Sequence, residues 1–314
     1  MKSILKRLGL LLVTLLIISL VVFLAFQIIP GDPTIKMLSI DEWTPEKATA
    51  LRAELGLDKP IMQRYFLWVI GMFTGNPGRS YGYNLSVSEL IAGKVSITFA
   101  LSAMAFALTA GIAIPLGMRL ARNPGGPVDR VVRVINQITM SIPPFFIGII
   151  FTYVFGLILK IFTPGVFIPF RENPVQCIIY LFFAALAIAL PKAAMALRLF
   201  NGSISAEAGR EYVRTAYSRG SSRRMAIKNH VFKNAIIPVI TFLALALGDI
   251  VAGSVIVEQI FAIPGLGRLL LLSISNRDFP VVQMIVVIIA AVIVTANFAA
   301  DAINRAIDPR MRAR

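Results

Sequence analysis

The stretch Arg198–Asn234, RLFNGSISAEAGREYVRTAYSRGSSRRMAIKNHVFKN, separates two long apolar runs of the chain. Its only acids are Glu207 and Glu211. Its basic residues are Arg198, Arg210, Arg214, Arg219, Arg223, Arg224, Lys228 and Lys233. An excess of Lys and Arg beside apolar segments marks the cytoplasmic side of a membrane protein. The stretch therefore predicts a cytoplasmic loop in a chain that crosses a membrane several times.

The overall composition supports this prediction. The chain has 314 residues, of which 57% are hydrophobic, and its mean hydropathy is +0.78. Soluble globular domains are not normally so apolar. The net charge of +15 gathers in the N-terminus, Arg119–Arg133, the loop at 198–234 and the C-terminal tail. This distribution follows the positive-inside rule, so no nucleic-acid partner is expected and membrane lipid is.

The expected fold class is all-α, with six transmembrane helices, because an apolar run of about 20 residues spans a bilayer. The predicted spans are Leu8–Ile29, Val95–Met118, Val134–Leu159, Gln176–Leu197, Ala235–Val257 and Val281–Ala302. Six spans place both termini on one side, and the basic clusters make that side cytoplasmic. The first run follows Lys2, Lys6 and Arg7, but it is long for a signal peptide and no A-x-A-like site follows. A retained membrane helix is therefore favoured over a cleaved signal peptide.

Three segments follow from this pattern. Residues 1–29 hold the cytoplasmic N-terminus and the first span, 30–94 form an extracytoplasmic helical segment, and 95–314 form a core domain with the other five spans. Within 30–94, Thr44 is the expected N-cap of a helix whose first residue is Pro45. A second, aromatic-rich amphipathic helix is expected at Ile61–Phe73.

Motifs for intrinsic chemistry are missing from the sequence. There is no G-x-x-x-x-G-K-[ST], H-E-x-x-H or G-x-S-x-G motif, and His230 and Cys177 are single residues of their kinds. We therefore expect no catalytic residue, no metal ligand set and no cofactor in this chain, and a membrane enzyme is disfavoured.

The basic loop has a helical pattern of its own. Tyr212, Val213, Ala216 and Tyr217 recur at i, i+3 and i+4 spacing, and Gly220 is a natural helix terminator. Ser221 or Ser222 can then cap a following helix. Two interpretations stay open on these residues alone: a docking surface for a cytoplasmic partner, or a helix that lies on anionic lipid.

Asp249 is the one acid in the middle of a predicted span. A charge at bilayer depth costs about 2.5–3.5 kcal/mol on insertion scales, so this carboxylate should face a polar interior or be neutralised. It is either a translocation-path group or a structural hydrogen-bond partner of another helix. Pro115, Pro143-Pro144 and Pro191 interrupt spans, where prolines act as hinges or as tolerated kinks.

A family resemblance joins these features. Tyr212–Gly220, followed by His230, Lys233-Asn234-Ala235 and Pro238, resembles the EAA loop of ABC importer permeases, and most closely that of the oligopeptide/dipeptide/nickel family. Arg214 and Thr215 replace the Glu-Ala pair of the general pattern, as is typical of this subfamily, and Tyr217 and Ser218 replace the more usual Arg and Ala. Further landmarks are Pro30-Gly31-Asp32-Pro33, Leu55–Pro60, Val257–Phe261, Pro264–Gly267, Asn276–Pro280 and Asp308-Pro309-Arg310. Together they resemble the first of the two permease subunits.

The resemblance implies a type I importer architecture in the cell membrane. Two homologous permeases enclose the path, two ATPase subunits bind ATP and Mg, and an extracytoplasmic binding protein delivers the substrate. The implied coupling residues are Tyr212, Val213, Arg214, Thr215, Ala216, Arg219 and Gly220, of which Ala216 and Gly220 are small enough for close approach to an ATPase. Arg214 and Arg219 can pair with ATPase acids, and the alternative is that either faces water or lipid headgroups.

The implied substrates are oligopeptides or dipeptides, and the alternative is nickel or a metal chelate. A stand-alone secondary transporter is the rival from another class. It would show inverted repeats and ion-coupling acids within the spans, and the sequence offers Asp249 alone.

Overall fold

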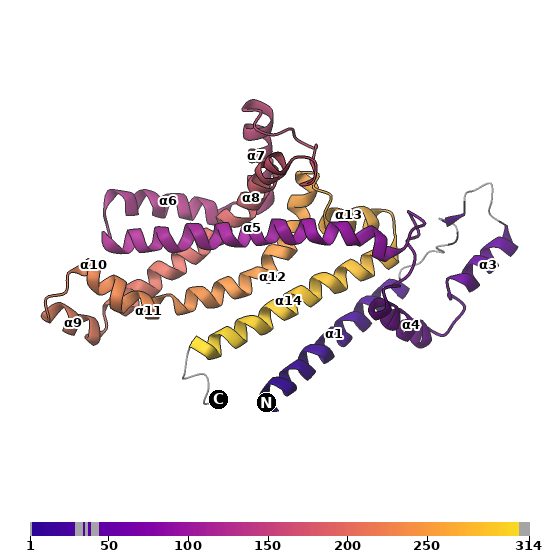
Figure 1. Ribbon diagram of the computed structural model, residues 1–314, viewed down its shortest axis with the longest axis horizontal. Helices are drawn as coiled ribbons and strands as arrows, with labels where there is room; N and C mark the ends of the chain where they lie inside the picture. The colour runs from indigo at the N-terminus through magenta and orange to yellow at the C-terminus, as the bar shows by residue number, and fades with distance from the viewer. Residues whose placement is uncertain (1, 29–33, 35–36, 39–43, 308–314) are drawn as a thin grey trace. The chain divides into compact units, whose positions relative to one another are not determined.

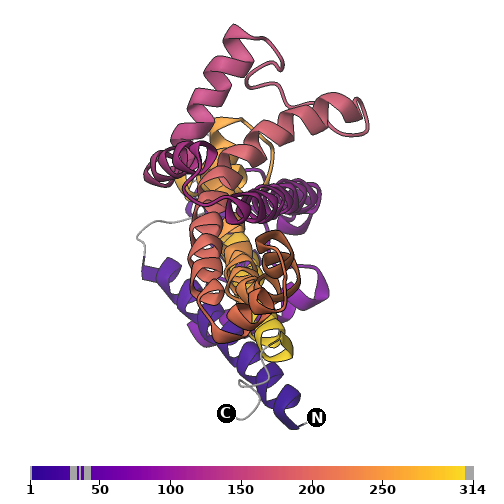
Figure 2. The same cartoon turned by 90° about the vertical axis from the view of Figure 1, so that its left-hand side faces the viewer.

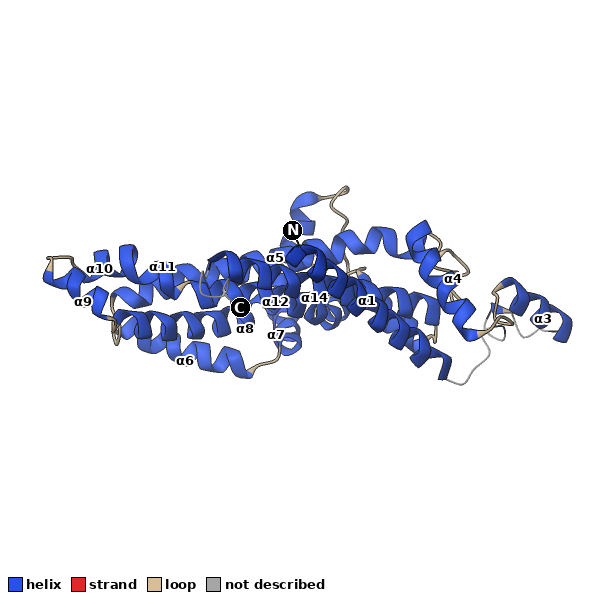
Figure 3. Ribbon diagram, turned by 90° about the horizontal axis from the view of Figure 1, so that it is seen from below, coloured by secondary structure: helices blue, strands red, loops and turns tan. Residues whose placement is uncertain are grey.

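The computed structural model describes residues 2–28, 34, 37–38 and 44–307. The landmarks Pro30-Gly31-Asp32-Pro33 and Asp308-Pro309-Arg310 lie outside the described residues. Everything with regular structure in the described part is helical, apart from an isolated bridge between Arg79 and Ser86 (Figure 3). The predicted all-α class is therefore confirmed.

The helices follow one another from α1 at the N-terminus to α14 near the C-terminus (Figures 1 and 2). Their bounds are α1 Lys2–Ile28, α3 Pro45–Glu54, α4 Ile61–Thr74, α5 Val87–Arg122, α6 Pro127–Ser141, α7 Pro144–Phe151, η1 Thr152–Ile158, α8 Pro174–Ala208, α9 Glu211–Ser218, α10 Arg223–Ala226, η2 Ile227–Val231, α11 Phe232–Ala235, α12 Ile237–Ile260, α13 Leu266–Ser275 and α14 Phe279–Ile307. The segments η1 and η2 are π-helical.

Five of the described helices are long and apolar enough to cross a membrane: α1, α5, α8, α12 and α14. The predicted third span, Val134–Leu159, differs from the expected continuous helix. It is a pair of helical segments, Pro127–Ser141 and Pro144–Ile158, that are bent by 104° where they meet at Pro143 (Figure 1). Counted as one broken span, the pair brings the number to six.

The prolines explain where the break falls. Pro115 and Pro191 lie inside α5 and α8 without ending them, whereas Pro143 and Pro144 are adjacent and separate α6 from α7. A proline removes one backbone donor and its ring crowds the preceding turn, so a helix ends before it more easily than it continues through it. Pro143 and Pro144 are instead the N-cap and the first residue of α7, where prolines are tolerated. Residue Ile142 adopts an extended conformation, as residues before proline prefer.

The chain divides into two compact units, and the first contains residues 1–98 and 264–294. In this unit, the Tyr65 hydroxyl of α4 lies 2.9 Å from the hydroxyl of Ser19 on α1, and the Phe23 ring packs edge-on against Tyr65. The predicted cap of α3 is confirmed, since Thr44 Oγ1 accepts a hydrogen bond from the Lys47 amide at 3.2 Å. The predicted second helix is also confirmed as α4.

A buried carboxylate joins two distant parts of the same unit. Asp278, directly before α14, is fully buried and accepts hydrogen bonds from the Ser80 hydroxyl and from the amides of Tyr81 at 3.0 Å and Gly82 at 3.2 Å. Burial raises the pKa of Tyr81, whose amide is one of these donors, to about 12. Asp278 therefore fixes the loop before α5 to the start of α14.

The second unit contains residues 99–263 and 295–314 and is organised around α8. This helix packs against α6, α7 and α12, and many of its buried residues are alanines. Small side chains let helices in a membrane approach closely. The single cysteine, Cys177, is buried in the same helix.

Candidate functional site

The candidate site is the turn between α8 and α12, where the sequence predicted a short helix (Figure 1). That helix is α9, eight residues long. Behind it, Gly220 has a φ of +85°, its amide donates to the Tyr217 carbonyl at 2.9 Å, and the Ser221 amide donates to the Ala216 carbonyl at 3.1 Å. This pair of bonds is the Schellman motif, which favours glycine because the left-handed conformation strains other residues. The predicted terminator is therefore confirmed.

The following helix begins as expected. Ser222 is the N-cap of α10, and its hydroxyl accepts a hydrogen bond from the Met225 amide at 3.4 Å. The alternative cap, Ser221, is instead part of the Schellman turn. After α10 the chain continues through η2 and α11 into the membrane helix α12.

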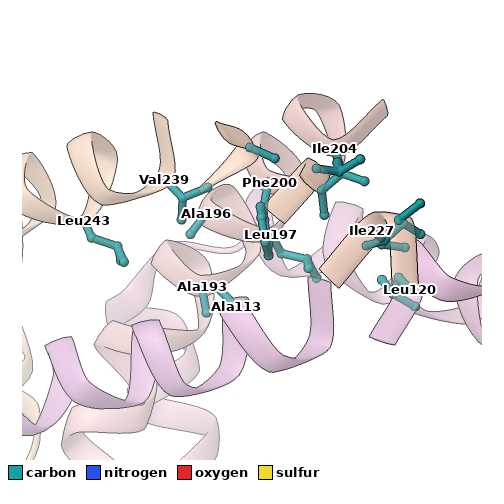
Figure 4. Packing of buried hydrophobic residues seen from close by; sticks show 14 of the residues in the cluster. Ala113, Leu120, Ala193, Ala196, Leu197, Phe200, Ile204, Ile227, Val239 and Leu243 are labelled. Atoms are coloured by element: carbon teal, nitrogen blue, oxygen red, sulfur yellow. The ribbon is translucent and has the colours of Figure 1, made fainter. Parts of the chain in front are cut away.

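One face of α9 is buried against the rest of the second unit, to which α9 also belongs. Val213 is fully buried and belongs to a cluster with residues of α5, α8, η2 and α12. Figure 4 shows Leu120, Phe200, Ile204, Ile227 and Val239 gathered in this cluster. Ala216 is also buried, so its small side chain allows α9 to pack closely against the rest of the second unit.

A second attachment comes from Tyr212. Its hydroxyl donates to Glu207 Oε2 of α8 at 2.6 Å and accepts from Asn234 Nδ2 of α11 at 3.1 Å. Burial raises the pKa of Tyr212, and the hydrogen bond to the Glu207 carboxylate raises it further. The hydroxyl therefore keeps the proton that it donates, and it joins the helices on either side of α9.

The opposite face of α9 is exposed and carries Glu211 and Arg214, and the excess of positive charge begins at Arg219, directly after the helix. Arg214, Thr215, Arg219 and Gly220 are all exposed. Beyond them, α10 adds the exposed Arg223, Arg224 and Met225. No ion pair within the described residues engages any of these arginines. The sequence-predicted site residues thus separate into a buried group, Val213 and Ala216, a bridging Tyr212, and an exposed group.

Asp249 has a partner that sequence reasoning missed. It lies on α12, and its Oδ2 is 2.7 Å from Nζ of Lys192 on α8. Both charges interrupt apolar runs, and this was the available signal; the pairing itself depends on which faces of the two helices meet. The carboxylate side chain remains 68% exposed in the chain on its own, and the lysine side chain 21% exposed.

Within the described residues, no group of three or more His, Cys, Asp or Glu is placed to hold a metal ion. The site offers instead a basic helical surface, rigidly attached to the membrane helices, and a charged pair at membrane depth.

Comparisons with known proteins show to which family the chain belongs. Residues 113–313 match the family model of the binding-protein-dependent transport system inner membrane component, and residues 1–102 match the model of its N-terminal region. A Brucella abortus protein named as a permease of a peptide transport system is 32% identical over 98% of each chain. The dipeptide transport system permease protein DppB of Lactococcus lactis is 31% identical over 99% of each chain.

Two further comparisons extend the range. The nickel import system permease protein NikB of Staphylococcus aureus (strain MRSA252) is 30% identical over 99% of this chain and 92% of its own. The crystal structure of an amino acid ABC transporter with histidines shares the fold, with a TM-score of 0.54 over 69% of this chain and 94% of that chain, at 17% identity.

The chain belongs to the family of binding-protein-dependent transport system inner membrane components. It is a multi-pass inner-membrane permease subunit of an ABC importer of the peptide, dipeptide and nickel type, and it is a non-catalytic component of that importer.

Proposed function

We propose that this chain forms half of the translocation path of an importer for oligopeptides or dipeptides, and that α9 is its coupling helix. The observation that carries the proposal is the two-sided character of α9, with a fully buried Val213 on one face and the exposed Arg214 and Arg219 on the other. The buried face attaches α9 to the helices that continue into the membrane, and the exposed arginines are available to a cytoplasmic partner.

In this proposal the site residues have different tasks. Val213, Ala216 and Tyr212 hold α9 on α8 and α11. Arg214, Thr215, Arg219 and Gly220 contact the ATPase, where the arginines pair with its acids and Gly220 admits close approach, since nothing lies within 4 Å of a Cβ built on it. Closure of the ATPases around ATP moves α9, and with it the membrane helices.

The family implies ATPase and substrate-binding partners, and we propose their number and place. Two ATPase subunits hold ATP and Mg below the membrane, a second homologous permease completes the path, and a binding protein docks outside. Residues 30–94 lie on that outer side, and both termini and the loop at 198–234 lie in the cytoplasm. The core domain at 95–314 then contains the remaining spans.

Nickel or a metal chelate is the alternative substrate, and it is favoured by the relation to the nickel permease of Staphylococcus aureus. The observation that separates the two is what the co-purified binding protein holds. Bound peptide in that protein would support import of peptides, and bound nickel or a nickel chelate would support the alternative substrate.

A stand-alone secondary transporter remains the alternative from another class. It predicts uptake that needs an ion gradient but neither ATP nor a second permease. Asp249 would then be the ion-coupling group.

The test is recovery of partners from native membranes in mild detergent with the tagged chain as bait. We expect a second permease and ATPases with the wild type, and loss of the ATPases alone with Gly220→Glu. Gly165→Glu is the matched control, because Gly165 also has a positive φ, +80°, with open space around it, but lies outside the loop. A chain that is recovered alone and transports without ATP would overturn the proposal.

A further inference from the structure

The pair Lys192–Asp249 lies where the membrane helices α8 and α12 pack against each other within the second unit. Lys192 is inside α8, Asp249 is near the middle of α12, and the two helices pack together. The charged atoms are 2.7 Å apart, which is the spacing of a direct, charge-assisted hydrogen bond.

The exposed residues around Asp249 indicate that the pair does not face lipid. Leu245 and Ile256, one turn before and two turns after Asp249, are also exposed, and so is Met195 one turn after Lys192. A carboxylate that is 68% exposed on such a stripe would meet hydrocarbon if the stripe faced lipid. Ionisable groups at that depth almost always face a water-filled cavity or another protein segment. The stripe therefore faces the inside of the assembled importer.

A shallow groove lies along α8 on the C-terminal side of Lys192; neither member of the charged pair lines it. It has a volume of about 620 Å³, and Met140, Met195, Leu199 and Phe242 contribute apolar walls. Arg198 of α8 also lines the groove. Methionine side chains are flexible and polarisable, so they adapt to partners of different shape. The pair and the groove share helix α8, and a charged pair followed along one helix by an adaptable apolar surface fits cargo with constant charged groups and variable side chains.

We propose that Lys192 and Asp249 set the charge selectivity of the translocation path, with Lys192 balancing Asp249 so that peptides of either net charge pass. This inference rests on the proposed function. A cation and an anion in contact carry no net charge together, and each can meet an opposite charge on the passing cargo. Removing one partner leaves the other uncompensated on the path, where it attracts one sign of charge and repels the other.

The experiment uses membrane vesicles that contain the complete importer, supplied with ATP and the binding protein. The probes are labelled Ala-Ala, Lys-Ala and Asp-Ala, with net charges of zero, plus one and minus one. Uptake by each variant is divided by wild-type uptake of the same dipeptide, so that the preference of the binding protein cancels.

Asp249→Asn should raise the ratio of Asp-Ala to Lys-Ala uptake by about tenfold or more, because it leaves Lys192 unbalanced. Lys192→Met should lower that ratio by a similar factor. The double variant Lys192→Met/Asp249→Asn should return the ratio to the wild-type value, and the charge-conserving Lys192→Arg should not change it.

Several outcomes would overturn the inference. Single variants that lose all three dipeptides equally would show a structural clamp between α8 and α12, and a double variant that keeps a shifted ratio would break the balance argument. Loss of the second permease from purified single variants would assign the pair to the subunit interface. If wild-type vesicles accumulate none of the dipeptides and no longer peptide of the same three net charges, the peptide-import function itself fails, and this inference falls with it.

Discussion

At the scale of single residues, the contacts of Asp278 explain why the Asn276–Pro280 segment contains an acid at position 278. Its carboxylate accepts one hydroxyl and two amide hydrogen bonds from residues 80–82, and Arg277 before it has a φ of +50°. A glycine at 82 suits this contact, because a Cβ there would lie 3.3 Å from Asp278 Oδ2. The three donors depend on a single acceptor residue.

Asp278→Ala should lower the stability of the protein by about 2 kcal/mol, because it leaves the buried Ser80 hydroxyl without its acceptor and removes two part-buried bonds from the amides of Tyr81 and Gly82. Thermal unfolding in detergent measures the loss. Asp58→Ala, an exposed acid of the same unit, is the control and should have little effect. Equal melting temperatures for both variants would contradict the role given to Asp278.

Gly117 is a second residue with a specific packing role. A Cβ built on it would lie 2.3 Å from Cδ1 of Phe200, whose ring is fully buried in the cluster below α9. Gly117→Ala should therefore destabilise the chain by about 1–3 kcal/mol through overpacking. Gly111→Ala is the matched control on the same helix, since nothing lies within 4 Å of its Cβ position. Thermal unfolding of both variants checks the difference, and a stabilised Gly117→Ala would disprove it.

At the scale of elements, α9 is too short to be stable by itself, because isolated helices below about 12–15 residues are marginal in water. Its order comes from Val213 inside the cluster, the Schellman turn at Gly220 and the bridge through Tyr212. Each of these attachments has a distinct contribution, and the first is the easiest to isolate.

Val213→Ala should loosen α9 by about 2 kcal/mol, since it removes buried methyl groups and leaves a cavity. Amide hydrogen exchange of residues 211–218 should become faster, while exchange in α12 stays slow. Ser218→Ala, an exposed change on the same helix, should leave exchange near the wild-type rate. Unchanged exchange in Val213→Ala would mean that the other attachments suffice.

Much of this element structure could be predicted from sequence, because it depends on local chemistry. Thr44, Ser222 and Gly220 cap helices through side-chain or backbone conformations that neighbouring residues decide. The inward direction of Ala216 and the break at Pro143 could not be predicted. Both depend on tertiary packing. In the first case packing decides which side of α9 meets the cluster, and in the second it decides whether a helix continues through its own proline, as α5 does at Pro115 and α8 does at Pro191.

The same limit applies to the candidate path. Asp249 was identified as an unusual charge in its span, but its ion pair joins residues 57 positions apart, and periodicity does not reveal which helix faces meet. A pairing of this kind becomes visible only when α8 and α12 are placed together.

At the scale of the whole molecule, the broken span decides the topology. If Pro127–Ser141 and Pro144–Ile158 together cross the membrane once, the loop at 160–173 is outside and the loop at 198–234 is inside. Alkaline phosphatase fused after Gly165 should then be active, and fused after Gly220 inactive. Green fluorescent protein at the C-terminus should fluoresce. An inactive phosphatase after Gly165 would mean that the bent pair re-enters on the cytoplasmic side.

The cluster around Val213 also has a mechanical consequence. Packed protein interiors have low compressibility, so a displacement of α9 is passed on instead of being absorbed. Its members on α8 and α12, such as Phe200, Ile204 and Val239, are in one continuous body with Val213. We therefore expect a force applied to α9 to displace α8 and α12 with little local distortion of the cluster between them.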